Sequence, residues 1–242
     1  MCPDNRFLFF KQVKEYFSDF FGLFFPQVCA SCGTKLLKNE NVICTFCLYH
    51  IPKTKFHLDK DNPVAKLFWG RAYIENATAW FLFHKGSGFQ KLLHKLKYNS
   101  RMDIGLTLGS YFGAELKNAV LYSNIDVVIP VPLHPKRQKK RGYNQSELIA
   151  RGIAEQMGIP VDITSLYRSK ATETQTKKSK DERWKNVENI FKIKDENILK
   201  GKHILLVDDV VTTGATLESC AHALLTAEGA KVSIACLAAS LR

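Results

Sequence analysis

The chain has 242 residues, of which 45% are hydrophobic and 24% are charged, a balance that excludes a largely disordered protein. Its formal net charge is +12, and residues 136–185 supply +7 of this, with 13 lysines and arginines against 6 aspartates and glutamates. We therefore expect a polyanionic partner, either a phosphorylated small molecule or nucleic acid, with a merely solubilising basic surface as the alternative.

The first 25 residues are rich in phenylalanine. Phe7, Phe10, Phe17, Phe21 and Phe24 lie three to four residues apart or at multiples of that spacing, which predicts an amphipathic helix. Charged residues interrupt every apolar run and no small-residue cleavage site follows, so we expect neither a transmembrane span nor a secretory signal. A cytoplasmic protein is expected. The helix is predicted to pack on the rest of the protein, and membrane association through it or through partners stays open.

Four of the seven cysteines follow next. Cys29, Cys32, Cys44 and Cys47 form two Cys-x-x-Cys pairs that are separated by 11 residues. Two such pairs supply the four thiolates of a tetrahedral Zn²⁺ site, so the spacing predicts structural zinc in a reducing compartment, with a redox pair as the weaker alternative. We assign residues 1–55 to a first domain, which holds the aromatic helix and the zinc module.

The second domain is assigned to residues 56–242 and follows a polar segment between Pro52 and Pro63 that has the composition of a linker. A strand is expected within 71–83, and helices are expected within 89–100 and up to Leu116. From Ile125 onward the pattern alternates, with strands expected at 125–132, 160–169, 202–209 and 230–240, and helices at 144–158 and 219–229. This alternation predicts a doubly wound parallel α/β sheet. The polar segment 169–185 is expected to be a long mobile loop.

A buried strand in the segment ILLVDDVVTTGAT, residues 204–216, runs into Asp208 and Asp209. Ligands of open α/β sheets bind beyond the carboxyl ends of the strands, so this pair is expected to meet a ribose diol or a Mg²⁺-bound substrate. The small and hydroxylated residues 212–216 precede a helix, which predicts a cradle for phosphate. A simple turn with a helix N-cap is the alternative. The P-loop pattern is absent.

The stretch VDDVVTTGAT resembles the phosphoribosyl pyrophosphate (PRPP) binding motif of type I phosphoribosyltransferases. The resemblance implies that Asp208 and Asp209 hold the ribose 2- and 3-hydroxyls and are the catalytic carboxylates. It also implies that residues 212–216 hold the 5-phosphate. The full substrate-binding segment is then Val210, Val211, Thr212, Thr213, Gly214, Ala215 and Thr216.

Nearly the whole chain, from about Phe24 to the end, resembles the ComF family, a phosphoribosyltransferase-like group that includes competence proteins needed for natural transformation. The segments that carry the resemblance are 129–150, 168–191, the four-cysteine module and LLHKLKYNS. It implies a pyrophosphate-binding loop after the strand at 125–132, with Lys136, Arg137 and Arg141 as contacts. It also implies a flexible hood loop at 168–186, where the recognisable positions are Gln175, Thr176, Arg183 and Asn186.

The resemblance implies a PRPP-binding protein that acts in DNA uptake, with Mg²⁺ accompanying PRPP and an unidentified acceptor. Single-stranded DNA and DNA-uptake or processing proteins are the implied partners. Two alternatives stay open, a nucleotide-salvage-type phosphoribosyltransferase enzyme and a non-catalytic PRPP-sensing regulator. Whether the bound sugar is ever transferred, and in which oligomeric state, is not predicted.

Overall fold

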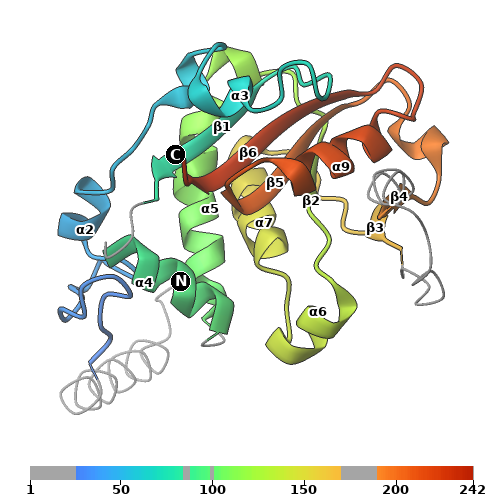
Figure 1. Cartoon of the computed structure of the whole chain (residues 1–242). Helices are drawn as coiled ribbons and strands as arrows, with labels where there is room; N and C mark the ends of the chain where they lie inside the picture. The colour runs from blue at the N-terminus through green and yellow to red at the C-terminus, as the bar shows by residue number, and fades with distance from the viewer. Residues whose placement is uncertain (1–25, 84–87, 99–100, 170–189, 242) are drawn as a thin grey trace, which may run out of the picture. The chain divides into compact units, whose positions relative to one another are not determined.

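A computed structural model describes residues 26–83, 88–98, 101–169 and 190–241 (Figure 1). The chain divides into two compact units, Met1–His50 and Ile51–Arg242. The domain boundary predicted between residues 55 and 56 falls inside the second unit. The aromatic helix predicted in the first 25 residues lies outside the described part of the chain. No helix within the described ranges is long and apolar enough to cross a membrane.

The described part of the first unit is built around its cysteines. Val28 and Lys35 form an antiparallel bridge, and the turn between them passes through Gly33, whose φ is +81°. Helix α2 (Thr45–Tyr49) starts directly after Cys44, which is its N-cap. Within residues 26–50, the buried apolar side chains other than cysteine are Ala30, Leu36, Val42 and Ile43, so the three buried cysteines make up a large share of what this part of the unit buries.

The second unit contains a four-stranded parallel sheet in the order β1-β6-β5-β2. Its strands are β1 (Ala77–Leu82), β2 (Val127–Pro130), β5 (His203–Val211) and β6 (Lys231–Ala239). Strands β1, β2 and β6 are apolar runs with nearly every residue buried, and β5 is fully buried over Ile204–Val207, as expected where helices cover both faces. The predicted doubly wound parallel α/β class is confirmed.

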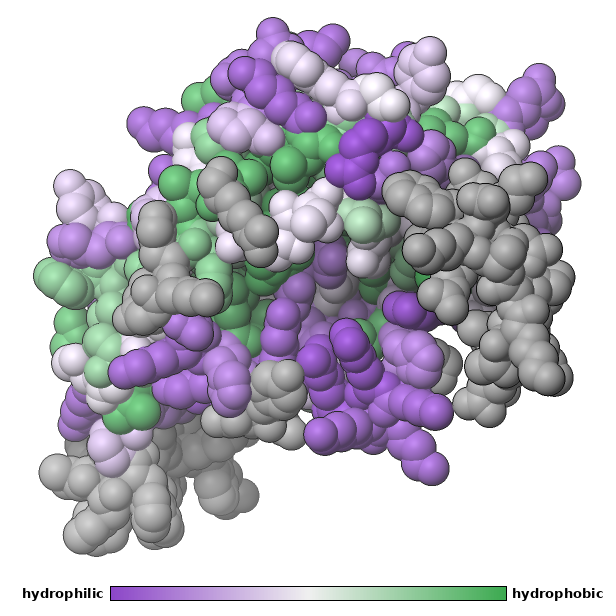
Figure 2. Space-filling view, in the orientation of Figure 1, coloured by the Kyte–Doolittle hydropathy of each residue, from purple (hydrophilic) through white to green (hydrophobic). Residues whose placement is uncertain are grey.

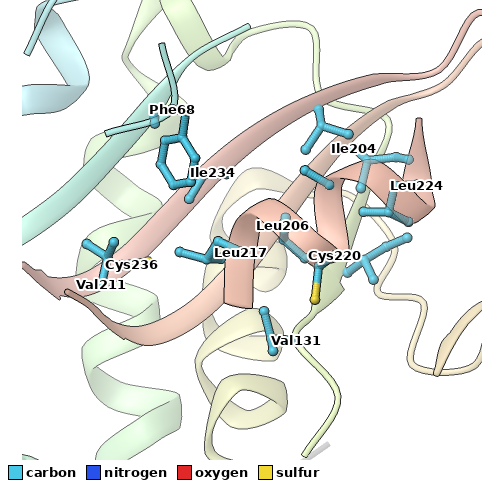
Figure 3. Close-up of a cluster of buried hydrophobic side chains, with 14 of the residues drawn as sticks. Phe68, Val131, Ile204, Leu206, Val211, Leu217, Cys220, Leu224, Ile234 and Cys236 are labelled. Carbon is cyan, nitrogen blue, oxygen red and sulfur yellow. The ribbon is translucent and has the colours of Figure 1, made fainter. Parts of the chain in front are cut away.

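Helices cover both faces of this sheet (Figure 1). The helices in the described part of this unit are α3 (Pro63–Lys66), α4 (Gly88–Tyr98), α5 (Met102–Lys117), α6 (Pro135–Arg141), α7 (Gln145–Met157) and α9 (Ala215–Leu224), with short 3-10 turns at Phe56–Leu58, Val120–Tyr122 and Glu196–Leu199. Alternate residues of β5 point to opposite faces. Ile204 and Leu206 pack with Leu217, Cys220 and Leu224 of α9 (Figure 3), and α5 and α7 lie on the other side of the sheet.

Helices α5 and α7 approach each other backbone to backbone. A Cβ atom built on Gly109 of α5 would lie 2.3 Å from the carbonyl oxygen of Ile149 in α7. One built on Gly152 of α7 would lie 2.3 Å from the carbonyl oxygen of Leu106. Only glycine fits at these two positions, and this contact fixes where α7 begins relative to the sheet.

Two expectations from the sequence are wrong. The strand expected at 160–169 is interrupted. Val161 forms a single parallel bridge to Val128 of β2, and Asp162 Oδ1 then accepts hydrogen bonds from the backbone N–H groups of Thr164 and Ser165 and turns the chain. The chain becomes extended again only as β3 (Leu166–Arg168), which pairs antiparallel with β4 (Phe191–Ile193) in a separate two-stranded sheet.

The segment expected to be a linker, between Pro52 and Pro63, is part of the second unit. The backbone N–H of Thr54 donates to the carbonyl of Trp80 at 2.9 Å, and the side chain of Asn62 donates to the carbonyl of Ala77 at 2.7 Å. The segment therefore runs along β1 as packed structure.

Candidate functional site

The acidic pair lies where the sheet loses one of its strands. Strand β2 pairs with β5 only as far as Pro130, which lies opposite Val207. Strand β5 continues beside β6, with Asp208 opposite Cys236 and its last pairing at Val211. Asp208 and Asp209 therefore lie beyond the end of β2, at the carboxyl edge where open α/β sheets bind ligands.

Asp208 is held by the start of α7. Ser146 Oγ and the backbone N–H of Asp209 both donate to Asp208 Oδ1 at 2.8 Å. Ser146 is in the first turn of α7, after Asn144, whose side chain accepts from the Ser146 N–H and so caps the helix. Burial and the neighbouring Asp209 raise the pKa of Asp208 to about 7.

Asp209 is paired with a lysine from a distant element. Lys97 Nζ, from the last turn of α4, lies 2.7 Å from Asp209 Oδ2. The sequence identified the surrounding segment LLHKLKYNS only as part of a family resemblance and gave Lys97 no role. Its position 112 residues before Asp209 explains why spacing alone did not reveal the contact.

The residues after the acidic pair form a small pocket at the start of α9. Gly214 has φ of +77° and is the N-cap of α9, and a Cβ there would lie 3.0 Å from the ring of Phe68. The open backbone N–H groups of the first helical turn are suited to an anion. The pocket has a volume of about 60 Å³ and is lined by Asp208, Val210, Val211, Thr212, Thr213, Gly214, Ala215, Thr216 and Leu217.

Arg71 supports this turn from the segment before β1. Its guanidinium donates to the carbonyl of Thr213 at 2.9 Å and pairs with Glu218 in the first turn of α9. Arg71 also donates to the carbonyl of Leu67, which ties the turn to the end of α3. Sequence reasoning missed Arg71 because no local motif surrounds it.

The basic segment after β2 is a helix, where a loop was expected. His134 Nδ1 accepts from the N–H of Lys136 and caps α6, which ends at Gly142 with φ of +81°. Figure 2 shows a hydrophilic patch over α6, and its cationic residues are Lys136, Arg137, Lys139, Lys140 and Arg141.

The basic residues predicted to bind the substrate are placed unequally. Arg141 donates to Gln145 Oε1 at 2.8 Å. Gln145 directly precedes Ser146, which donates to Asp208, so two neighbouring residues of α7 connect Arg141 to the acidic pair. Within the described residues, no hydrogen bond or ion pair joins Lys136 or Arg137 to that pair. The hood positions Gln175, Thr176, Arg183 and Asn186 lie outside the described residues.

The four cysteines of the first unit meet at one point. The sulfur atoms of Cys29, Cys32, Cys44 and Cys47 all lie within 4.8 Å of one another, and the Cys32 and Cys44 sulfurs are 3.7 Å apart. Tetrahedral bonds of about 2.3 Å to zinc separate the ligand sulfurs by roughly 3.8 Å, so the donor set fits such an ion. Backbone N–H groups of Cys44 and Cys47 donate to the sulfurs of Cys29 and Cys44, at 3.3 and 3.4 Å. Such outer hydrogen bonds orient metal ligands.

The chain is similar to several known proteins. A family model described as "Phosphoribosyl transferase domain" matches residues 143–242. "DNA utilization protein YhgH" of Escherichia coli O157:H7 is 34% identical over 223 residues, which is 88% of this chain and 91% of that protein. "Competence protein ComFC" of Bacillus subtilis (strain 168) is 30% identical over 203 residues, which is 82% of this chain and 78% of that protein. A solved glutamine PRPP amidotransferase from B. subtilis matches 58% of this chain and 30% of its own, with 23% identity and a TM-score of 0.40.

Proposed function

The chain belongs to the ComF/YhgH family of proteins with a phosphoribosyltransferase domain, and from this premise we propose that it binds PRPP and acts in the uptake or utilisation of DNA. The ribose hydroxyls donate to the carboxylates of Asp208 and Asp209. The 5-phosphate accepts hydrogen bonds from the turn at residues 212–216 and the first turn of α9. The acceptor of any transfer is unidentified.

One observation carries this proposal. A single stretch of backbone presents two carboxylates, then a glycine turn, then a helix N-terminus. Asp208, the turn and the helix N-terminus line one pocket at the edge of the sheet, and Asp209 is the next residue after Asp208. Carboxylates suit a sugar diol, and the helix N-terminus suits a phosphate. These two kinds of group therefore suit the two ends of a phosphorylated ribose.

The remaining substrate contacts are assigned to the basic residues. Arg141, through its place beside α7, is proposed to bind the pyrophosphate together with Lys136 and Arg137 of α6. Mg²⁺ bound with PRPP supplies Lewis-acid charge at the pyrophosphate, and Asp208 and Asp209 are hard oxygen ligands of the type that it accepts. The chain's own part is to orient the ribose and to balance the charge of the leaving group.

We assign zinc to the four-cysteine cluster, as a structural ion that stabilises the first unit. Four thiolates close the coordination shell and leave no position for a substrate, which is typical of structural zinc sites.

Calorimetry with PRPP and Mg²⁺ tests the binding site. The double variant Asp208→Ala/Asp209→Ala is expected to lose at least tenfold in affinity, or about 1.4 kcal/mol, because both hydroxyl acceptors are removed. The matched control is Asp59→Ala/Asp61→Ala, which makes the same change in charge at two exposed residues of the same unit. Equal affinity of the two double variants would refute the assignment.

Two further measurements separate the biological alternatives. Transformation assays in a naturally competent host test the link to DNA, and intact transformation with an acidic-pair variant that no longer binds PRPP would refute it. Release of pyrophosphate from PRPP in the presence of candidate bases would identify an enzyme. Tight PRPP binding without release supports a regulator that senses PRPP.

A further inference from the structure

The pairing of Lys97 with Asp209 has no role in the functions assigned so far. The side chains of Lys97 and Asp209 are 27% and 14% exposed, so the pair is largely withdrawn from water. Withdrawing two charges from water is costly, and their attraction offsets that cost only with good geometry. A partly buried ion pair at the carboxyl edge of the sheet therefore suggests a role at the ligand site.

Lys97 is also the cation that contacts the acidic pair within the described residues. Among the described residues, the ion pairs of Asp208 and Asp209 include Lys97 alone, while Arg141 donates to Gln145. The charge of Lys97 also acts on Asp208 and lowers its pKa against the larger effects of burial and of Asp209. The Lys97 ammonium group thus interacts with both carboxylates, through an ion pair with Asp209 and through its charge with Asp208.

The positions of the substituents on ribose determine which group lies next to the Lys97 ammonium when the sugar binds. If the 2- and 3-hydroxyls lie on the two carboxylates, the substituent on C1 projects from the carbon next to C2. In PRPP that substituent is a diphosphate. A lysine ammonium has three donors, so it can keep one hydrogen bond to Asp209 and offer the others to a phosphate oxygen.

Resting on the proposed function, we propose that Lys97 binds the diphosphate on C1 of the ribose and balances the charge of Asp209 until that ligand arrives. The sugar site then contains a cation from α4 in addition to the basic residues after β2. Helix α4 thereby becomes part of the binding site, through a residue 112 positions before Asp209.

Two ligands that differ only at C1 test this role. Calorimetry compares PRPP with ribose 5-phosphate, both with Mg²⁺, on the wild type and on Lys97→Met. We expect the variant to lose about tenfold or more in affinity for PRPP, or about 1.4 kcal/mol, because a hydrogen bond between two charged groups is lost. Affinity for ribose 5-phosphate is expected to change less than about twofold.

The controls stay on the same helix. Lys91→Met removes an exposed charge from α4 and is expected to leave both affinities unchanged. Lys97→Arg keeps the charge and is expected to retain most of the PRPP affinity, and thermal unfolding of all three variants shows that they are folded.

Three results would overturn the inference. Equal losses for both ligands would mean that Lys97 acts only by orienting Asp209. Tighter binding of both ligands would mean that Lys97 merely occupies the empty site. If Lys97→Met binds PRPP as the wild type does, Lys97 has no role there. A wild type that binds neither ligand refutes the proposed function itself, and the role of Lys97 falls with it.

Discussion

At the scale of single residues, the charged form of Asp208 destabilises the folded protein. Its pKa of about 7 is well above the value of about 4 that is ordinary for aspartate, because the side chain is buried beside a second carboxylate. Between these two values the folded chain binds a proton that the unfolded chain has released. The contribution of Asp208 to stability is therefore lost as the pH rises from about 4 through 7.

Replacing this carboxylate by a neutral amide is expected to stabilise the protein. The Oδ1 of asparagine in Asp208→Asn can still accept from Ser146 and from the backbone N–H of residue 209. We expect its melting temperature to exceed that of the wild type, by more at pH 8 than at pH 5, while PRPP binding weakens.

The matched control variant, Asp103→Asn, is expected to change the stability of the protein in the opposite direction. Arg101 lowers the pKa of Asp103 through a direct side-chain hydrogen bond, so Asp103→Asn should destabilise the protein above the ordinary pKa of aspartate. A pH-independent difference between Asp208→Asn and the wild type would show that Asp208 is not electrostatically strained.

The sequence predicted the part of the candidate site that lies in one continuous segment of the chain. Asp208, Asp209 and the turn around Gly214 lie in one short segment, and strand, turn and helix signals place them together. Lys97, Arg71 and Ser146 were assigned no role. They reach the site from three other elements, and only the packing of those elements makes the contacts. Single-sequence patterns do not contain that information.

At the scale of secondary-structure elements, the close contact of α5 and α7 has a direct consequence. Ser146 is in the first turn of α7, so the seating of α7 on α5 also determines where the Asp208 carboxylate is held. Gly109 and Gly152 permit that seating.

At this contact, replacing glycine by alanine is expected to destabilise the protein, although alanine usually stabilises a helix. Alanine favours an exposed helix over glycine by about 1 kcal/mol. In Gly109→Ala the new Cβ would meet the backbone of α7, and overpacking of this kind costs about 1–3 kcal/mol. Chemical denaturation should therefore show a net loss of stability.

The comparison variant is Ala114→Gly, at an exposed position of the same helix, which should lose only the helix preference of about 1 kcal/mol. If Gly109→Ala proves more stable than the wild type, the two helices are not in backbone contact.

Element prediction succeeded where periodicity was strong and failed where a polar side chain redirected the chain. The four strands of the main sheet and helices α5, α7 and α9 were expected in place, although α9 begins at Ala215 and ends at Leu224, before the Gly229 that was expected to stop it. The turn formed by Asp162 limited one expected strand to a single bridge beside β2. The caps at His134 and Gly142 made a helix of the expected basic loop. Caps of this kind depend on local hydrogen bonds that a hydrophobic pattern does not display.

At the scale of the whole molecule, the two units derive their stability from different sources. The second unit buries apolar side chains on both faces of its sheet, whereas the described part of the first unit gathers four thiols and few large apolar residues. Without an ion, burial raises the pKa of Cys47 to about 12, so this thiol keeps its proton at neutral pH. A metal ion must displace that proton, which makes metal binding weaker as the pH falls.

Removal of the metal is expected to affect one unit selectively. A zinc chelator should increase hydrogen exchange in residues 26–50, because the ligand bonds that fold them are lost. Exchange in the β5 and β6 strands should stay slow, and PRPP binding should persist. Metal analysis is expected to give one zinc per chain for the wild type and for Leu37→Ala, which changes a 72% exposed side chain of the same unit, but none for Cys29→Ser. Loss of protection throughout the chain would contradict two separate sources of stability.

The early end of β2 has a consequence for solubility as well as for binding. Beyond Val207, β5 is no longer flanked by β2, so it changes from an inner strand to an edge strand within its own length. Exposed edges invite another chain to add a strand, and charged side chains oppose that addition. Asp208 and Asp209 lie on this edge, so the groups that we propose to hold the sugar would also keep two copies of the protein from joining through their sheets.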